Sequence, residues 1–384
     1  MSDVKQPSKR VLLISGYDAA SHKYWRQSLE SGLKDYSWTQ VSLPDRYYAW
    51  RIRGNGLTLA YQYKEILSKN YDCLIVTSMV DLNSLRGFIP ELAKIPTIVY
   101  CHENQFDYPH NEQKLDMANR LNAQLSSIYA MLSANKVLFN SHYNRESYLS
   151  GAKKLLKKLP DGVPTGIIES IQSKSSVLAV PIVSPDITSS FVGKSKQLME
   201  IVWNHRWEFD KQPEVLFSAL NKLKALGYQF RLHVMGQSFR KVPECFEKAR
   251  VDLQEEIVTW GYQSLQAYHN ILNQADVVVS TALHDFQGLS MLEAISRGCH
   301  PIAPNRVAYP EYIESTDLYQ VGVNLDEGQQ LCEKLVELYQ RWEVNSTNLK
   351  VDYLKKMQEY STEHLLPQYK TLINATISVE VSSE

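Results

Sequence analysis

The chain has 384 residues, of which 44% are hydrophobic and 22% charged, and its formal net charge at pH 7 is −1. A chain of this length exceeds what one hydrophobic core usually supports, so the sequence predicts two domains of about 200 residues each. The near-neutral charge excludes nucleic-acid binding through bulk positive charge but leaves a local basic patch open. No segment approaches the roughly 18 unbroken apolar residues of a membrane span, and the polar N-terminus lacks the apolar core of a secretory signal. We therefore expect a cytoplasmic protein.

Five cysteines lie far apart in the chain and form no Cys-x-x-Cys pair. This spacing argues against a disulfide framework and against a zinc site. We interpret the cysteines as buried free thiols.

Short apolar runs alternate with amphipathic stretches of about 12 to 20 residues, which is typical of a parallel sheet with crossover helices. In the first half the predicted strands are 11–15, 72–77, 97–101 and 136–140, and the predicted helices are 21–34, 57–69 and 113–133. The segment 181–196 is rich in Pro, Ser and Gly and carries no sustained period, so it is predicted to link the domains.

A second series follows, with strands predicted at 198–203, 229–235, 257–260, 276–281 and 300–303, and helices at 213–226, 264–273 and 289–297. Further helices are predicted at 327–342 and 345–360. We predict an α/β fold of two Rossmann-like, doubly wound domains that face a central cleft. The N-terminal, acceptor-binding domain spans residues 1–190, the C-terminal, nucleotide-sugar-binding domain spans 191–360, and a tail over 361–384 is able to return to the first domain.

Open α/β sheets bind ligands beyond the carboxyl ends of their strands, so the residues after each predicted strand are the first candidates for a site. In the loop Gly16–Lys23, small residues permit a tight turn, Ser21 is a candidate helix cap, and His22 is not required by a turn. After the third strand, His102 has an ordinary pKa near neutrality and could accept or orient a hydroxyl proton, with Glu103 fixing its tautomer or binding substrate. Ordinary hydrogen-bonded turns are the alternative for both loops.

The first strand of the second half is followed by Arg206 and Lys211, which flank the loop before a helix that starts near Pro213. The two cations and the N-terminus of that helix could converge on a diphosphate, because Arg supplies a planar fork for phosphate oxygens and Lys a mobile point charge. An exposed charge pair is the alternative.

The predicted strand 276–281 is followed by a polar loop with Asp285, by Gly288, and by a helix. Gly288 lets the backbone approach a ligand, and the free amides of Leu289 and Ser290 would point at a phosphate. The carboxylate of Glu293 cannot help to bind phosphate and fits better as an acceptor for paired ribose hydroxyls.

The segments NHRWEFDKQPE and DFQGLSMLEA resemble the signature of the large retaining glycosyltransferase family four, which has the GT-B fold. The resemblance implies that Arg206 and Lys211 bind the diphosphate of a nucleotide-sugar donor. In the family a motif of the form ESFGLxxLEA follows, and here Asp285 stands at its first Glu while Gln287 replaces a common Phe. Because that first carboxylate normally contacts the donor sugar, the shorter Asp could shift sugar preference or reduce activity.

With the segments GYDAASHK and YCHENQ added, the set resembles the tRNA-queuosine mannosyltransferase group over nearly all of the chain. This resemblance implies GDP-mannose as donor, the cyclopentene-diol of queuosine in a tRNA anticodon as acceptor, and transfer with retention. We find no Asp-x-Asp motif and expect neither a cofactor nor a metal. The expected catalytic residues are His102, Glu103 and Asp285, and the expected donor-binding residues are Gly16, Arg206, Lys211, Gly288, Leu289, Ser290 and Glu293.

Two segments bear on a tRNA acceptor. Residues 45–56 interleave aromatic side chains with arginines, which suits stacking on unpaired bases, whereas aromatic packing with surface arginines is the alternative. Residues 151–162 place four lysines at helical spacing beside three leucines, which suits phosphate contacts, a membrane-surface helix or a solvated face. The acceptor contacts that we expect are Ser21, His22, Lys23, Asn104, Arg51 and Arg53.

Three hypotheses about function stay open at this point. The first is a mannosyltransferase that modifies tRNA, the second a glycosyltransferase of lipid or polysaccharide acceptors, and the third an inactive GT-B module that only binds RNA or protein. A nucleotide sugar and tRNA are the expected partners and a membrane is not. The sequence does not decide the oligomeric state.

Overall fold

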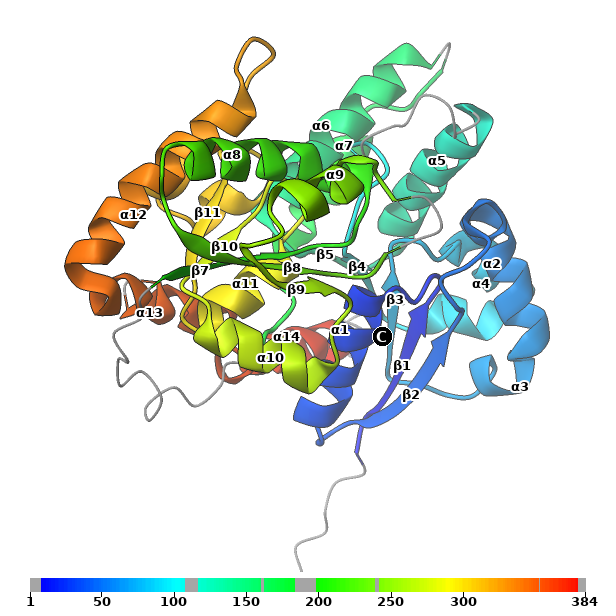
Figure 1. Ribbon diagram of the computed structural model, residues 1–384. Helices are drawn as coiled ribbons and strands as arrows, with labels where there is room; N and C mark the ends of the chain where they lie inside the picture. The colour runs from blue at the N-terminus through cyan, green and yellow to red at the C-terminus, as the bar shows by residue number, and fades with distance from the viewer. Residues whose placement is uncertain are drawn as a thin grey trace, which may run out of the picture. The chain divides into compact units, whose positions relative to one another are not determined.

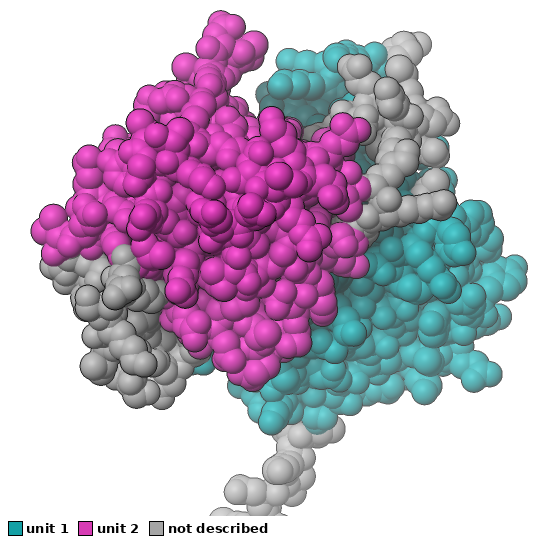
Figure 2. Space-filling model, viewed as in Figure 1, with its two compact units in different colours: residues 1–181, 362–384 teal, residues 182–361 magenta. Residues whose placement is uncertain are grey.

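The computed structural model describes residues 8–107, 117–159, 162–183, 198–238, 242–351 and 353–378. The chain divides into two compact units, each of which is described by itself (Figure 2). Unit 1 comprises Met1–Pro181 and Thr362–Glu384, and unit 2 comprises Ile182–Ser361. Most of the expected linker 181–196, including the expected boundary after residue 190, lies outside the described residues.

Unit 1 contains a six-stranded parallel sheet in the order β2-β1-β3-β4-β5-β6 (Figure 1). Its strands are β1 (Arg10–Ser15), β2 (Ser37–Ser42), β3 (Cys73–Thr77), β4 (Thr97–Cys101), β5 (Lys136–Phe139) and β6 (Ser175–Val177). All residues of β3 and β4 are buried, as expected for parallel strands that are covered on both faces. The sequence analysis missed β2, because SWTQVS is mostly polar and only Val41 is buried.

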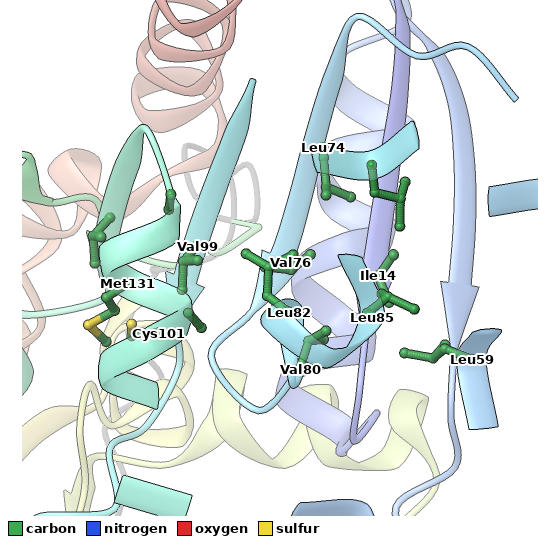
Figure 3. Packing of buried hydrophobic residues seen from close by; sticks show 14 of the residues in the cluster. Ile14, Leu59, Leu74, Val76, Val80, Leu82, Leu85, Val99, Cys101 and Met131 are labelled. Carbon is green, nitrogen blue, oxygen red and sulfur yellow. The ribbon is translucent and has the colours of Figure 1, made fainter. Parts of the chain in front are cut away.

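The helices of unit 1 are α1 (Ala20–Gly32), α2 (Tyr48–Gln62), α3 (Lys64–Leu67), α4 (Leu82–Phe88), α5 (Met117–Ser133), α6 (His142–Lys158), α7 (Ile167–Ser173) and α14 (Thr362–Ser378), with a 3₁₀ turn η1 (Pro90–Lys94). Figure 3 shows how Leu59 of α2 and Leu82 and Leu85 of α4 gather with Ile14 and Val76 of the sheet into one apolar cluster. In the part of the chain that the structure describes, no helix combines the length and the apolar character needed to cross a bilayer.

Helix α2 begins at Tyr48, nine residues before the predicted start at Leu57. The prediction was wrong because Gly54 and Gly56 indicate a break in a helix, whereas here both glycines make room for close packing. A Cβ at Gly56 would lie 3.1 Å from the carbonyl oxygen of Asp81, and a Cβ at Gly54 would overlap the ring of Trp50.

The last helix, α14, packs in unit 1 although it follows the whole of unit 2 in the chain. Trp25 of α1 donates a hydrogen bond from Nε1 to the hydroxyl of Tyr369, over 3.1 Å. That hydroxyl in turn donates to the carbonyl of Ala179, over 2.9 Å. Tyr369 thereby ties α14 to α1 and to the segment after β6.

Unit 2 contains a second six-stranded parallel sheet in the order β12-β11-β10-β7-β8-β9 (Figure 1). Its strands are β7 (Met199–Asn204), β8 (Phe230–Met235), β9 (Ile257–Gly261), β10 (Val277–Val279), β11 (His300–Pro304) and β12 (Leu318–Tyr319). Val277 and Val279 belong to one buried cluster and Val278 to another, because alternate side chains of a strand point to opposite faces. Helices therefore cover the sheet on both faces, and the predicted α/β class with two doubly wound sheets is confirmed.

The helices of unit 2 are α8 (Pro213–Ala225), α9 (Cys245–Asp252), α10 (Leu265–Gln274), α11 (Leu289–Ser296), α12 (Glu327–Val351) and α13 (Leu354–Met357). Short 3₁₀ turns are η2 (Phe209–Lys211), η3 (Tyr309–Glu311), η4 (Ser315–Asp317) and η5 (Gln358–Tyr360). The two helices predicted at 327–342 and 345–360 are instead one long helix, α12, followed by α13 and η5.

Candidate functional site

The strands β7 and β10 are neighbours in the unit 2 sheet, and the chain extends the sheet from this pair in opposite directions. Doubly wound folds bind ligands at the carboxyl ends of such a pair. Asn204 is the last residue of β7, so Arg206 lies at this edge, and the loop from β10 to α11 brings Asp285 and Gly288 to the same edge. The sheet topology therefore gathers the expected donor-binding residues of unit 2.

Lys211 is a buried cation held between these two loops. Its Nζ donates to the carbonyl of His284 over 2.6 Å and lies 3.4 Å from carboxylate oxygens of both Asp210 and Asp285. Only 6% of the residue is exposed. Lys211 is thus a fixed charge at the edge of the sheet and not the mobile ammonium that the sequence analysis expects.

Asp285 is the shorter acid at the start of the DFQGLSMLEA segment. Tyr309 donates a hydrogen bond to its Oδ2 over 2.7 Å, while its Oδ1 faces Lys211. Burial by itself raises the pKa of Asp285, but Lys211 and the hydrogen bond from Tyr309 contribute to holding that pKa below its ordinary value. Asp285 is therefore ionised at neutral pH.

Arg206 differs from Lys211 in being half-exposed. Its Nη1 lies 2.9 Å from Oε2 of Glu208, and both side chains are accessible to solvent. A surface ion pair of this kind contributes little to stability, so an anion of higher charge can displace Glu208 at small cost. The Arg206 guanidinium is therefore accessible to a ligand at this edge.

Helix α11 begins at this edge with Gly288 as its N-cap, at φ +76°. A Cβ at Gly288 would overlap the hydroxyl of Tyr312, so both conformation and space require glycine. Leu289 and Ser290 lie in the first turn, where amides have no preceding carbonyl within the helix to accept their hydrogen bonds. This end of α11 is suited to bind an anion.

His205 adds a neutral imidazole beside the start of α11. Its Nδ1 lies 3.4 Å from Oγ of Ser290, and its Nε2 is buried without a hydrogen-bond partner among the described residues. Burial lowers the pKa of His205 to about 4, so the ring is uncharged at neutral pH.

Glu293 lies one turn into α11 and is oriented by two polar side chains. Tyr268 of α10 donates to its Oε2 over 3.0 Å, and Asn204 donates from Nδ2 to the hydroxyl of Tyr268 over 3.0 Å. Asn204 also donates to the carbonyl of Ser290 over 2.9 Å. Burial raises the pKa of Glu293, and the hydrogen bond from Tyr268 offsets part of that effect.

In unit 1, His22 of α1 and His102 after β4 stack on each other with ring centroids 4.1 Å apart. Both are buried, and burial lowers the pKa of each, so both rings are neutral at pH 7. Across the described ranges, His102 Nε2 and both ring nitrogens of His22 have no hydrogen-bond partner. The structure thus places His22, an expected acceptor contact, directly against His102, an expected catalytic residue.

The histidine pair rests on an aromatic support. His102 makes edge contacts with Trp25 and Tyr100, at centroid distances of 4.9 and 4.7 Å. Trp25 and Tyr100 stack on each other at 4.2 Å, and Trp25 is bonded to Tyr369 of α14. Rings that are packed in this way hold the imidazoles in one orientation.

Other expected residues of unit 1 have structural partners. Gly16 is buried, and a Cβ there would lie 3.2 Å from Val80. Asn104 fixes the turn after β4, because its Nδ2 donates to Oδ1 of Asn144 over 2.8 Å while its Oδ1 accepts from the amide of Phe106 over 3.0 Å. Both ends of the Asn104 amide are thus occupied within unit 1, and its expected acceptor contact stays a prediction.

One further expectation for α1 is corrected. Ser21 does not cap α1, because the N-cap is Ala19 and no side chain caps that end. In α2, Arg51 is buried, its Nε has no hydrogen-bond partner among the described residues, and its expected acceptor contact stays a prediction. Lys23 is exposed, and Arg53 is exposed over 54% of its side chain while pairing with Asp81 at 3.1 Å.

Glu103 lines a pocket of unit 1 at the carboxyl ends of β3 and β4. The pocket is also lined by residues of α2, α5 and α6 and of the adjoining loops: Ile52, Ser78, Met79, Asn104, Gln105, Ala123, Ser126, Ser127 and Tyr148. The cavity has a volume of about 10 Å³, which is room for about one water molecule, and Glu103 and Gln105 give it a polar side.

The lysine-rich segment forms the end of α6. Leu155 and Leu156 pack against the unit 1 core, while Lys153, Lys154 and their neighbours Lys157 and Lys158 are exposed. Because the apolar face is already covered, the interpretation as a membrane-surface helix is not supported. An exposed basic face remains.

Sequence reasoning missed His205, Asn204, Tyr268 and Tyr309. For His205 and Asn204 a signal was present, since they lie at the end of a buried strand in the same segment as Arg206. Tyr268 and Tyr309 reach the edge from a helix and a 3₁₀ turn that bear no local mark of a site. Their roles depend on contacts between distant parts of the chain.

Comparisons with known proteins agree with this geometry. A family model described as tRNA-queuosine alpha-mannosyltransferase N-terminal matches residues 10–182, and one described as Glycosyl transferases group 1 matches residues 189–363. A protein of Drosophila melanogaster named tRNA-queuosine alpha-mannosyltransferase is 30% identical over 97% of this chain and 98% of its own length. The chain belongs to the tRNA-queuosine alpha-mannosyltransferase family. As a member of this family it is a nucleotide-sugar-dependent glycosyltransferase.

Solved structures show the fold of this family member. A glycosyltransferase from Rickettsia africae has a TM-score of 0.68 at 15% identity, over 97% of this chain and 99% of that one. The pneumococcal O-GlcNAc transferase GtfA, solved with UDP and GlcNAc, has a TM-score of 0.61 at 17% identity. That match covers 82% of this chain but only 59% of GtfA, so this chain spans about three fifths of the longer protein. The predicted GT-B fold is confirmed.

Lys211 is buried and Arg206 is not, so these two cations at the carboxyl edge of the unit 2 sheet should differ in their effect on stability. Replacing Lys211 with Met leaves the buried Asp210 and the partly buried Asp285 without their counter-ion, which should lower the free energy of unfolding by about 3 kcal/mol. Arg206→Ala should change it by no more than about 0.5 kcal/mol, because the side chain is exposed. Urea unfolding at neutral pH measures both, and a Lys211→Met variant as stable as the wild type would contradict the assignment.

Proposed function

We propose that the chain transfers a mannosyl group from GDP-mannose to the cyclopentene-diol of queuosine in a tRNA anticodon, with retention. The observation that carries this proposal is the match over 97% of the chain to a relative named as a tRNA-queuosine alpha-mannosyltransferase. The carboxyl edge of the unit 2 sheet supports this proposal, since that edge presents Arg206 and the start of α11 for a diphosphate and Glu293 for a ribose. The expected cytoplasmic location remains part of the proposal, because tRNA is its acceptor.

For the donor, we assign the diphosphate to Arg206 and to the first-turn amides of α11, at Leu289 and Ser290. The guanidinium exchanges Glu208 for phosphate oxygens, and the amides meet the remaining negative charge. Glu293, held by Tyr268, accepts hydrogen bonds from the paired ribose hydroxyls. Lys211 acts mainly by fixing the loop that carries Asp285, and its charge adds to the positive potential at the diphosphate.

In the proposed reaction the bond between the anomeric carbon and the diphosphate oxygen breaks, and a bond from that carbon to the acceptor hydroxyl oxygen forms on the same face. The acceptor proton passes to an oxygen of the leaving diphosphate. Arg206 and the α11 amides stabilise the charge that develops on that group, which is the largest contribution expected of the protein. Asp285, ionised and held by Tyr309, is assigned to a hydroxyl of the mannose.

On the acceptor side, we assign His102 and Glu103 to the hydroxyls of the substrate. A neutral imidazole accepts a hydrogen bond from a hydroxyl, and His102 has a buried Nε2 that makes no hydrogen bond within the described residues. His22, which stacks on His102, limits the ring to one orientation.

We further propose that transfer needs no metal or other cofactor, because Arg206, the helix N-terminus and Lys211 already supply positive charge at the diphosphate. Among the described residues, no three His, Cys, Asp or Glu side chains gather where they could hold a metal ion. Activity that is unchanged by a chelator would support this part of the proposal, and activity that requires added Mg²⁺ or Mn²⁺ would contradict it.

The proposed reaction is tested by incubating the pure protein with labelled GDP-mannose and tRNA that contains or lacks queuosine. Label should enter only the queuosine-containing tRNA, and other GDP and UDP sugars should serve poorly. Arg206→Ala should lower kcat/KM about 100-fold, because one charge-stabilising group is removed from the transition state. The matched control is Arg231→Ala, an exposed arginine at the second position of β8. If no donor labels queuosine tRNA, the proposed function is wrong, and wild-type activity in Arg206→Ala would remove the donor site.

The raised pKa of Glu293 predicts a pH dependence of nucleotide binding. The ionised carboxylate accepts both ribose hydroxyls, whereas protonation removes one acceptor, so affinity for GDP should fall as the pH drops through the pKa of Glu293. Because burial raises this pKa above 4.5, the decline should begin at a higher pH than for an ordinary Glu. Calorimetric titration of GDP between about pH 5 and pH 8 measures the effect. Glu293→Gln should bind about 10-fold more weakly at neutral pH and show a flatter profile, and superimposable profiles would contradict the assignment.

A further inference from the structure

Trp50 lies on α2 with its indole ring flat against its own helix. Gly54, one turn further on, leaves the space that the ring occupies, since a Cβ at this position would overlap the ring atoms. The indole Nε1 donates to Oγ1 of Thr58 over 3.3 Å, which aligns the ring along the helix. One face of the indole thus covers Gly54, and 53% of the residue is exposed. The structure presents the other face as a flat aromatic surface in a fixed orientation.

Gly54 is otherwise costly in this position. Glycine in the interior of a helix is less favourable than alanine, because it loses more conformational freedom on folding. The backbone of Gly54 is helical, so its φ does not require glycine. The atoms nearest to a Cβ at this position all belong to the Trp50 ring, so glycine makes room for that ring. The helix gives up stability for a surface ring that contributes little to the core.

The segment that leads into α2 is aromatic and cationic. Tyr47 is 72% exposed and adopts a left-handed conformation, at φ +55°, that side chains rarely adopt. The guanidinium of Arg46 lies 5.6 Å from the centroid of the Tyr47 ring. Arg53 is half-exposed and pairs with Asp81 at 3.1 Å. Helix α2 itself carries no acidic residue, and Asp45 is the one carboxylate between residues 45 and 62. Backbone strain at an exposed aromatic residue is typical of a binding surface.

The surface is continuous with the pocket that contains Glu103. Arg53 donates from Nη1 to Oγ of Ser126 over 3.1 Å, and Ser126 lines that pocket together with Ile52 of α2. The buried face of α2, which includes Leu59, is anchored in the core of unit 1 (Figure 3). A ligand in contact with Trp50 therefore meets a helix that is anchored in the core of unit 1 and that borders the small cavity lined by Glu103.

We propose that Trp50 is a stacking platform for an unpaired base of an RNA acceptor, with Arg46 and Arg53 placed for the neighbouring phosphates. This inference rests on the proposed function, which it deepens by assigning an RNA-contacting surface. Bases stack on exposed aromatic rings whatever their sequence, and cations beside the ring complement the nucleic-acid backbone. A lipid surface fits less well, because a ring that lies flat on its helix does not project into a bilayer.

The proposal is tested by measuring the affinity of the full-length protein for queuosine-containing tRNA. Trp50→Ala should weaken binding at least about 10-fold, and Trp50→Phe, which keeps an aromatic face, should recover part of the loss. Gly54→Ala should also weaken binding because its Cβ displaces the ring, yet its thermal unfolding temperature should not fall, since alanine favours the helix. Phe88→Ala is the matched control, an aromatic residue of the same unit with 48% exposure, and should bind as the wild type does.

The outcomes separate this inference from the proposed function. If the wild type mannosylates queuosine tRNA and both Trp50→Ala and Gly54→Ala bind that tRNA normally, the platform is overturned and the function stands. If the wild type mannosylates nothing but Trp50→Ala still weakens tRNA binding, the function fails and the platform stands. If Trp50→Ala instead reduces cosedimentation with phosphatidylserine vesicles and leaves tRNA affinity unchanged, the surface contacts lipid and the proposal is overturned.

Discussion

The buried ammonium of Lys211 is the interaction on which the donor edge of unit 2 depends. It lies between Asp210 and Asp285 and donates to the carbonyl of His284, so it joins the loop after β7 to the loop after β10. Backbone contacts reinforce the junction, since the amide of Leu283 donates to the carbonyl of Asp210 over 2.8 Å. Removing the Lys211 cation would leave two carboxylates without their counter-ion, so the same side chain contributes both to the stability of unit 2 and to the geometry of the donor site. A ligand diphosphate then meets a preformed edge, whose order costs no free energy at the moment of binding.

In both units, the residues that would contact a ligand are held in place by other residues that would not contact it. Tyr268 and Asn204 orient Glu293, Tyr309 holds Asp285, and Gly288 sets the start of α11. In unit 1, Trp25 and Tyr100 support the histidine pair, and the last helix of the chain contributes Tyr369 to that support. Polar groups that would contact a ligand are thus fixed by residues that would not, as preorganised binding requires.

Periodicity and strand order carried most of what could be predicted from the sequence. Buried parallel strands are nearly continuous apolar runs, so β3 and β4 were found, and the residues after β7 and β10 followed from the binding rule for doubly wound sheets. The edge strand β2 was missed because its side chains are mostly polar, and the start of α2 was misplaced because Gly54 serves packing and not a break. Whether a charge is buried also escaped prediction. Lys211 and Arg206 look alike in the sequence, and only the surrounding loops make one a fixed internal charge and the other an accessible one.

The central claim is that the carboxyl edge of unit 2 binds the nucleotide diphosphate of the donor. A crystal structure of the full chain with GDP tests it most directly. The account predicts phosphate oxygens within hydrogen-bond distance of the Arg206 guanidinium and of the amides of Leu289 and Ser290, with both ribose hydroxyls on Glu293. A diphosphate bound elsewhere in the protein, or a ribose that leaves Glu293 bonded to Tyr268 alone, would contradict it.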